Sequence, residues 1–390
     1  MLGKEARQSP QTMLLAMAFI MPLTFSVWNA LLNNFVVEQV GFTGREIGIL
    51  HSLREIPGFL AFTAIFVLIV LREQVFALLS LLLMSLAIAS TGYFPSVVGL
   101  YATTVIMSMG FHYFETINQS LTLQFLPHRD TAHFMGRALA VKAAASLLAY
   151  GSIWLLMGQL EISYGAMYML AGCLGLVLTL LIWVVFPQFE PHTVQHKKII
   201  LRKRSGLYYA LKFMSGARRQ IFMVFAAFMM VEKFGYSVQK ISGLFLLNYL
   251  FNLVFAPRIG RWIGAVGERK ALLLEYSGLI IVFSCYAFVE TAWLAAALYV
   301  IDHFFFSLAI AIDTYFQKIA DPADIASNAS VSFTINHIAA VVIPVLLGYV
   351  WLESPSAVFL TGVAFAVGSL TLSLMVPPQP APGRELQRIY

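Results

Sequence analysis

The chain alternates between long apolar runs and short breaks that are charged or rich in turn residues. A helix that crosses a bilayer needs about 20 predominantly apolar residues, and these runs have that length. The pattern predicts an all-α polytopic membrane protein with twelve transmembrane helices, near residues 12–34, 46–71, 75–93, 97–125, 137–158, 164–186, 207–233, 241–262, 270–289, 293–317, 328–351 and 356–376. The sequence shows no ten-residue segments of alternating polarity, so a β-barrel is not expected.

The first apolar run follows Lys4 and Arg7, as the hydrophobic region of a signal peptide does. It lacks a cleavage site of the small-x-small type and continues for more than about 20 residues. We therefore interpret it as the first span and not as a removed leader.

Composition supports a lipid environment. Of the 390 residues, 59% are hydrophobic and only 11% are charged, whereas about a quarter of the residues in ordinary soluble domains are charged. The two cysteines, Cys173 and Cys285, lie in apolar runs, which excludes a disulfide scaffold. The net charge of +6 is typical of basic loops that face the cytoplasm, and no nucleic-acid partner is expected.

The distribution of lysine and arginine predicts the orientation. An even number of spans puts both termini on one side, and most of the basic breaks fall on that same side. The opposite breaks contain only Arg45, Lys233 and Lys240. Because cytoplasmic loops are enriched in basic residues, we expect both termini to be cytoplasmic, and we expect a multi-pass protein of a bacterial inner (plasma) membrane.

Two segments of the chain are copies of each other. Residues 35–50 read FVVEQVGFTGREIGIL and residues 229–244 read MMVEKFGYSVQKISGL. The offset that aligns Glu38 with Glu232 and Gly41 with Gly235 also aligns Asp130 with Asp324. This predicts a parallel repeat of six spans.

The repeat divides the chain into a six-helix bundle over 1–186, a cytoplasmic linker over 187–206 and a second six-helix bundle over 207–390. In helical repeats of this kind the substrate site lies near the middle of the bilayer, between the two halves.

The break after the eighth span resembles the short cytoplasmic signature of the major facilitator superfamily: a glycine, an acidic site, a second glycine and then basic residues. The residues concerned are Gly260, Gly264, Gly267, Arg269 and Lys270. Gly264 occupies the acidic position, and the equivalent break at 71–74 is degenerate. The resemblance implies twelve helices in two halves, alternating access, and a tight basic turn that locks neighbouring helix ends in one state.

Two subfamily patterns are missing. The fifth span lacks the glycine-proline motif of drug–proton antiporters, and the first span lacks the Glu-x-x-Glu-Arg cluster of peptide transporters.

Ionisable residues inside a span are expensive, so each one is a functional candidate. Arg218 and Arg219 lie mid-span beside Gly216 and point about 100° apart on a helix. One guanidinium can therefore bind an anionic substrate while the other braces a neighbouring helix. Two alternatives stay open: both arginines lie at the cytoplasmic edge, or both form structural pairs with Asp302 and Glu115.

The fourth span carries His112, Glu115 and Asn118 along one helical stripe. Burial disfavours the charged form of a carboxylate, which makes Glu115, with His112 beside it, a candidate for proton coupling. Asn118 is a substrate-binding candidate. The alternative is a set of hydrogen bonds between helices.

The tenth span carries Asp302 and His303 near its middle, and both are candidates for proton coupling or gating. Asp313 lies nearer the cytoplasm and is expected to pair with Lys318. Glu275 lies near a cytoplasmic helix end and is expected to extend its carboxylate to the interface.

Weaker candidates complete the set. Arg54 and Glu55 in the second span form either a gate salt bridge or a ligand site. Lys142 in the fifth span occupies the repeat position of Asn336 in the eleventh, so both are substrate-binding candidates. Asn29 belongs to a polar stripe of the first span.

Other functional signatures are absent from the sequence. It has no phosphate-binding glycine-rich loop and no paired zinc-ligand spacing, so we expect no cofactor, no metal and no enzyme activity. The leading hypothesis is a monomeric, proton-coupled secondary transporter of a small anionic or zwitterionic organic solute, in contact with membrane lipids. The alternatives are efflux of amphipathic compounds and a non-transporting assembly factor or sensor.

Overall fold

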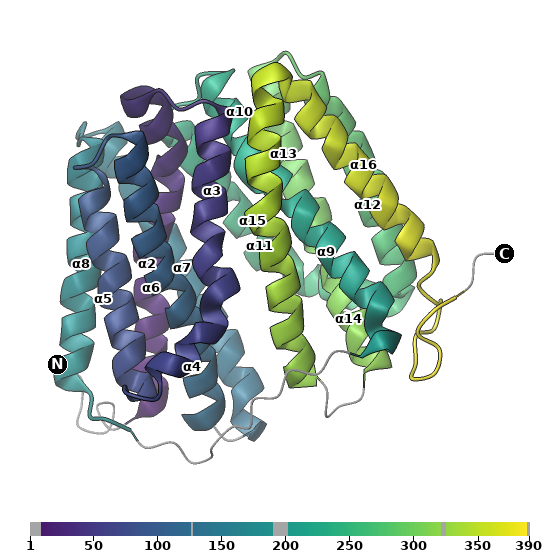
Figure 1. Ribbon diagram of the computed structural model, residues 1–390, viewed down its shortest axis with the longest axis horizontal. Coiled ribbons are helices and arrows are strands. Elements are labelled where there is room, and N and C mark those ends of the chain that lie inside the picture. Colours follow the sequence, from purple (N-terminus) through teal and green to yellow (C-terminus); the bar gives the residue numbers. More distant parts are fainter. Residues whose placement is uncertain (1–8, 126–127, 190–201, 321–324, 388–390) are drawn as a thin grey trace. The chain divides into compact units, whose positions relative to one another are not determined.

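The computed structural model describes residues 9–125, 128–189, 202–320 and 325–387, and these residues form helices joined by short turns (Figure 1). The first six passes consist of α2 (Pro10–Phe35), α3 (Gly44–Phe59) with α4 (Ala64–Val67), α5 (Glu73–Thr91), α6 (Val97–Phe125), α7 (His128–Gly158) and α8 (Tyr164–Val185).

The next six passes consist of α9 (Gly206–Gln220) with α10 (Ala227–Glu232), α11 (Val238–Val266), α12 (Glu268–Ala287), α13 (Ala292–Ser307) with α14 (Ile310–Ile319), α15 (Ile325–Glu353) and α16 (Pro355–Leu374). The twelve predicted spans are thus confirmed in the part of the chain that the structure covers. The described residues contain no strand beyond an isolated bridge between Ala381 and Arg384.

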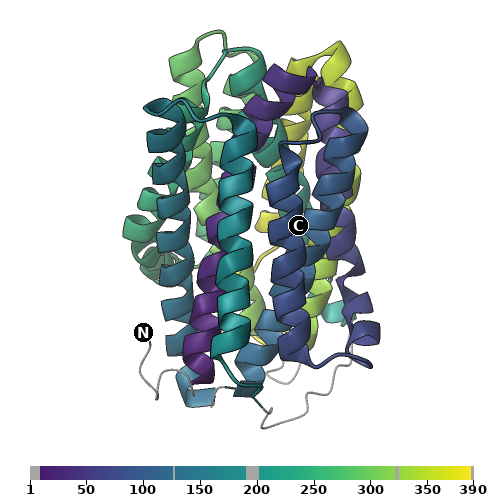
Figure 2. The same ribbon diagram turned by 90° about the vertical axis from the view of Figure 1, so that its left-hand side faces the viewer.

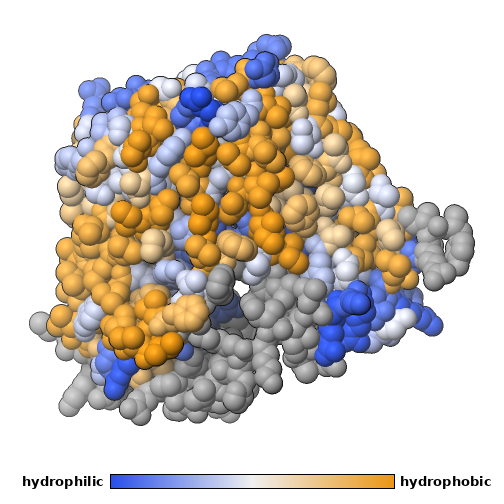
Figure 3. All heavy atoms as spheres, in the orientation of Figure 1, coloured by the Kyte–Doolittle hydropathy of each residue, from blue (hydrophilic) through white to orange (hydrophobic). Residues whose placement is uncertain are grey.

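Three passes differ from ordinary spans. Nine segments of the described residues are long and apolar enough to cross a membrane as helices; the remaining passes are α3–α4, α9–α10 and α11. A 3₁₀ turn at Leu60–Thr63 interrupts the first of these, and a π-helix at Ile221–Ala226 interrupts the second. Figure 3 shows apolar side chains along the flanks of the helices and hydrophilic ones gathered near their ends.

Serine side chains cap the starts of three helices. Ser9, Ser163 and Ser354 each accept a hydrogen bond from the backbone N–H three residues later. Such a cap satisfies one of the N–H groups that a helix start leaves without a partner. These serines therefore fix where α2, α8 and α16 begin.

The repeat seen in the sequence is present in the backbone. Gly41 ends the first pass with φ +73°, and its counterpart Gly235 ends the seventh with φ +60°. Both values lie in the left-handed region, where only glycine is free of a steric penalty. The matched glycines confirm that the two segments are structural copies. Asp324 lies outside the described residues, so its predicted correspondence to Asp130 stays a prediction.

Helix packing repeats as well. α2 packs on α7 and α8, and α9, its equivalent, packs on α15 and α16. Likewise α5 packs on α6 and α8, while α12 packs on α13 and α16 (Figures 1 and 2). The same pairs of passes therefore build the core of each half.

Two compact units emerge from the contacts. The first comprises Met1–Gly41, Leu53–His196 and Ser237–Leu246, and the second comprises Phe42–Ser52, Lys197–Tyr236 and Leu247–Tyr390. The short segment 42–52 belongs to the first half in sequence but groups with the second unit. Likewise, the segment 237–246 belongs to the second half in sequence but groups with the first unit. The predicted boundaries at 186 and 207 remain a prediction, since most of the linker lies outside the described residues.

The expected loop of the signature is mostly helix. α11 continues to Val266, so Gly260 and Gly264 lie inside it, and only Gly267 is a turn residue, with φ +87°. The helix continues because Ile259 and Ile263, one turn apart, are buried on one face. The prediction that Gly260 and Gly264 belong to a break after the eighth span was therefore wrong.

Candidate substrate and coupling site

A fully buried ion pair joins α9 to α12 in the second unit. Arg218 Nη2 donates to Glu275 Oε1 at 2.7 Å, and the two side chains are 2% and 0% exposed. The guanidinium also lies 5.2 Å from the centre of the Tyr276 ring, in a cation–π contact. Asp302 of α13 is 1% exposed and interacts electrostatically with both members of the pair.

This pairing corrects two expectations. Glu275 does not extend to the interface, because its carboxylate is held against Arg218. The acidic residue that accepts a hydrogen bond from Arg218 is Glu275, and not Asp302 or Glu115 as the structural alternative proposed. The signal in the sequence was the arginine itself: a mid-span cation needs an anion on a neighbouring helix, and Glu275 lies in the ninth span.

Arg219 lies on a different face of the same helix. Arg218 and Arg219 lie in the middle of the pass from Gly206 to Glu232, so the cytoplasmic-edge alternative is wrong. Whereas Arg218 is buried, Arg219 is half-buried. It shares a stripe with Lys212, about two turns before it, and Met223, about one turn after it, and both of these side chains are also accessible.

Asn336 of α15 reaches the same stripe. A Cβ atom at Gly216 would lie 2.5 Å from Asn336 Oδ1, so the missing side chain at residue 216 is what allows this amide to approach α9. Gly216 is one helical turn from Arg219. Two of the three substrate-binding candidates predicted for this unit, Arg219 and Asn336, thus lie on adjoining parts of α9 and α15.

Two further ion pairs lie near helix ends. Lys212 Nζ is 2.6 Å from Asp313 Oδ1, and Lys318 Nζ is 2.6 Å from Glu268 Oε1. The expected pairing of Asp313 with Lys318 was therefore wrong. The reason is that Glu268, buried in the first turn of α12, takes Lys318, which leaves Asp313 of α14 to the lysine of α9.

Aromatic rings gather around Phe222, about one helical turn beyond Arg218. Phe222 stacks on Tyr299 with ring centroids 4.7 Å apart, and the His303 ring lies 6.4 Å from Phe222. His303 is half-buried, so it differs from the fully buried Asp302 that precedes it.

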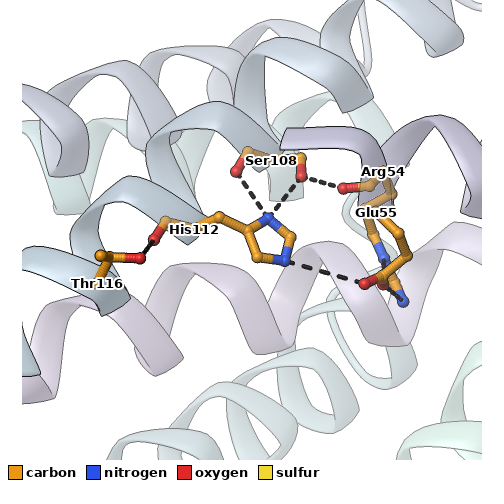
Figure 4. Close-up of polar contacts among 5 residues, drawn as sticks. All are labelled: Arg54, Glu55, Ser108, His112 and Thr116. Atoms are coloured by element: carbon orange, nitrogen blue, oxygen red, sulfur yellow. Dashed lines mark hydrogen bonds and ion pairs between the residues drawn. The ribbon is translucent and has the colours of Figure 1, made fainter. Parts of the chain in front are cut away.

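The first unit contains its own buried polar cluster (Figure 4). Arg54 Nη2 lies 2.6 Å from Glu55 Oε1, and the side chains are 9% and 6% exposed. The predicted salt bridge is confirmed, and its role as a gate stays a prediction. Ser108 Oγ donates to the Arg54 carbonyl and is hydrogen-bonded to His112 Nδ1 at 2.9 Å, which turns His112 Nε2 toward Glu55 at 3.9 Å.

The residues of the predicted stripe on α6 contact two different helices. His112 faces α3, whereas Glu115 Oε1 accepts from Lys142 Nζ of α7 at 2.8 Å. Both members of this pair are about one-third exposed, at 32% and 29%. Asn118 and Asn29 are half-buried. Two candidates assigned to different roles, Glu115 and Lys142, therefore neutralise each other.

The basic residues of the signature lie at the start of α12. Arg269 Nη1 donates to Gln387 Oε1 at 2.8 Å, and Lys270 is exposed. Arg269 is thus held by the segment that follows α16. The predicted locking of helix ends by this turn stays a prediction.

Twelve helical passes in two copies, with buried charges at mid-pass, define a class: polytopic helical membrane transporters built from a six-helix repeat. The chain matches the family model of the Major Facilitator Superfamily over residues 14–344. It therefore belongs to this family of secondary transporters and is an integral multi-pass membrane protein.

Solved structures share the fold. The nucleoside transporter NupG is similar with a TM-score of 0.74 at 15% identity, covering 94% of this chain and 98% of NupG. A bacterial homologue of the human lysosomal transporter Spinster, in an inward-facing and unoccupied conformation, is similar with a TM-score of 0.72 at 14% identity, covering 99% and 100%. No curated protein matches the chain. At these identities the likeness shows the fold alone.

Proposed function

We propose that the protein is a proton-coupled secondary transporter of a small anionic or zwitterionic organic solute, and that Arg219 is the residue that contacts the anion. The observation that carries this proposal is the difference between two adjacent arginines. Arg218 is neutralised by a buried carboxylate at 2.7 Å, so its charge serves the ion pair that links α9 to α12. Arg219, on the accessible stripe, is placed to meet a solute.

The chemistry of arginine favours an anion. A guanidinium is always charged and binds a carboxylate or phosphate through two parallel hydrogen bonds. Asn336 brings an amide to the same region, and an amide can accept from an ammonium group as well as donate to a carboxylate. This pair of groups supports a zwitterionic solute as readily as a simple anion.

Transport in proteoliposomes tests the proposal. The panel contains carboxylates, organic phosphates, amino acids and amphipathic cations, with nucleosides added because the nucleoside transporter NupG shares the fold. We expect uptake or exchange of one anionic or zwitterionic class, and we expect a pH gradient to drive it uphill. No flux of any solute would favour the sensor hypothesis.

Conservative variants test the assignment of residues. Arg219→Lys keeps the charge and loses the fork, which should weaken binding by about 1.5–3 kcal/mol, or roughly ten- to a hundredfold. Arg218→Lys should lower the melting temperature instead. Arg258→Lys, at an exposed position of α11, is the matched control. Normal anion binding by both variants would move amphipathic efflux to first place.

We also propose that both termini are cytoplasmic. Reporter fusions at Lys203 and Pro382 should report the cytoplasm, and a fusion at Glu290, in the turn between α12 and α13, should report the outside. A cytoplasmic reading at Glu290 would contradict the proposed orientation.

A further inference from the structure

The cluster around Arg218 has an uncompensated charge. If all three ionisable side chains were charged, Arg218 would contribute one positive charge, and Glu275 and Asp302 would contribute two negative ones. The Arg218 and Glu275 side chains are 2% and 0% exposed, and Asp302 is 1% exposed. Removing each ion from water costs several kcal/mol, and only a paired partner offsets that cost. A surplus negative charge at this depth requires a bound cation.

The hydrogen bonds indicate which oxygen atoms are open to such a cation. Glu275 Oε1 is occupied by Arg218 at 2.7 Å. Asp302 Oδ1 and Glu275 Oε2 are both buried and make no hydrogen bond, and neither does the Tyr276 hydroxyl. A carboxyl without an ion-pair partner is neutral in a low-dielectric site, because it takes up a proton in preference to remaining charged.

We propose that Asp302 carries an exchangeable proton, which it shares with Glu275, and that this is the coupling proton of the transporter. Only the coupling role of this proton rests on the proposed function. The site itself depends on burial, charge and the unpaired oxygens.

The surroundings of Asp302 support a proton over a metal ion. The electrostatic partners of Asp302 are the charged groups Arg218 on α9 and Glu275 on α12, and the neutral hydroxyls of Tyr286 on α12 and Tyr299 on α13. The adjacent His303 is half-buried. The Arg218 guanidinium would repel a metal ion bound within the cluster. A proton instead converts the carboxylate to a neutral group.

The position of the two arginines links this proton to the substrate. Arg218, which binds Glu275, and Arg219, which contacts the proposed substrate, are neighbours at the end of α9, directly before the π-helix Ile221–Ala226. π-Helical turns frequently occur at functional sites. An anion at Arg219 adds negative charge beside a cluster that already has a surplus, so anion binding favours the protonated state.

This linkage has a definite sign. Because the coupling is reciprocal, protonation of Asp302 must strengthen anion binding, and affinity should rise as pH falls. One proton limits the change to about tenfold per pH unit. On release, Asp302–COOH gives the carboxylate and a proton that leaves to solvent.

The first experiment needs no substrate. Infrared spectra of the purified protein at pH 7 should show the C=O stretch of a protonated, buried carboxyl. Asp302→Asn should remove this signal. The variant removes no hydrogen bond from Oδ1, since this oxygen makes none, so it should fold. Glu115→Gln, which alters the carboxylate paired with Lys142, about one-third exposed at 32%, is the matched control and should keep the signal.

Two results would overturn the inference. In the first, the signal persists in Asp302→Asn; if it then vanishes in Glu115→Gln, the protonated carboxyl lies in the first unit. In the second, the wild type shows no protonated carboxyl at all. A higher melting temperature in sodium chloride than in choline chloride would then show that Na⁺ compensates the charge.

Transport separates this inference from the proposed function. If the wild type accumulates an anion against its gradient at acidic outside pH, Asp302→Asn should lose accumulation, retain exchange and bind the anion independently of pH. Gradient-driven accumulation by Asp302→Asn would overturn the inference and leave the proposed function intact. A wild type whose flux ignores the pH gradient would contradict the proposed coupling instead, whatever the infrared result.

Discussion

Each half of the molecule buries an arginine–glutamate pair, and the two pairs are built differently. Arg54 and Glu55 are adjacent residues of α3, with one positive and one negative charge. Arg218 and Glu275 lie on different helices, α9 and α12, and share their site with Asp302. The first pair is balanced within one helical turn. The second binds two helices together and leaves a surplus charge, so only the second needs a proton to be neutral.

Removal of the arginine should produce the largest difference in stability between the two sites. Arg218→Ala leaves Glu275 and Asp302 buried together without a counter-ion. Breaking a buried pair in this way costs about 3–5 kcal/mol, so we expect a large loss of folded protein and a markedly lower melting temperature in detergent. The measurement is thermal unfolding of purified protein, followed by the loss of monodisperse material.

The double variant Arg218→Met/Glu275→Met controls for the charge. Replacement of a whole buried pair by apolar groups is often neutral or stabilising, so it should recover much of the stability lost in Arg218→Ala. If Arg218→Ala melted like the wild type, the ion pair between α9 and α12 would not contribute to stability, and the contrast between the two units would disappear.

Arg54→Ala should cost less than Arg218→Ala. Glu55 keeps a second partner, since His112 Nε2 lies 3.9 Å from Glu55 Oε2 and can take up a proton. Loss of a charged hydrogen bond with partial compensation costs about 1–3 kcal/mol. The check is the melting temperature of Arg54→Ala with and without His112→Ala. Equal melting of the single and double variants would show that His112 does not compensate.

Much of the fold could be predicted from the sequence, because a bilayer fixes the length of a span and its apolar character. All twelve passes were predicted, and the correspondence of Gly41 with Gly235 followed from the alignment of the two repeated segments. The signature segment was predicted wrongly, because its glycines were interpreted as turn residues. Gly260 and Gly264 lie in a helix that the buried side chains of Ile259 and Ile263 stabilise, and hydropathy does not show which glycine turns the chain.

The sequence predicted which residues take part in polar contacts more successfully than it predicted which residues pair with each other. Arg218, Asp302, Glu115 and Lys142 all lie at polar contacts or in buried clusters. Their partners depend on helix rotation and on which passes are neighbours, and neither follows from the sequence of one helix. Glu275 was missed as a partner for this reason: it was expected near a helix end, and the sequence does not show that its carboxylate reaches Arg218 of α9.

The turn glycines should respond alike in both halves, in contrast to the charge pairs. Alanine at Gly41 or at Gly235 meets no atom within 4 Å, yet it must adopt φ +73° or +60°. A left-handed backbone costs a residue with a side chain about 1–2 kcal/mol. We expect equal decreases in melting temperature for the two variants. Gly264→Ala, inside α11 with open space at its Cβ, is the control and should be stabilising by about 0.5–1 kcal/mol. Unequal decreases at Gly41 and Gly235 would contradict the equivalence of the repeat.

The smallest effect on stability is expected at the pair that joins α6 to α7. Lys142 and Glu115 are close, at 2.8 Å, but they are 29% and 32% exposed. Solvent screens such a pair, and exposed ion pairs contribute about 0–1 kcal/mol. Lys142→Met and Glu115→Gln should therefore change the melting temperature far less than Arg218→Ala or Arg54→Ala, although all three pairs have nearly the same length. A loss at Lys142→Met as large as that at Arg218→Ala would show that burial does not separate the pairs. The surplus charge around Asp302 would then no longer distinguish the second unit.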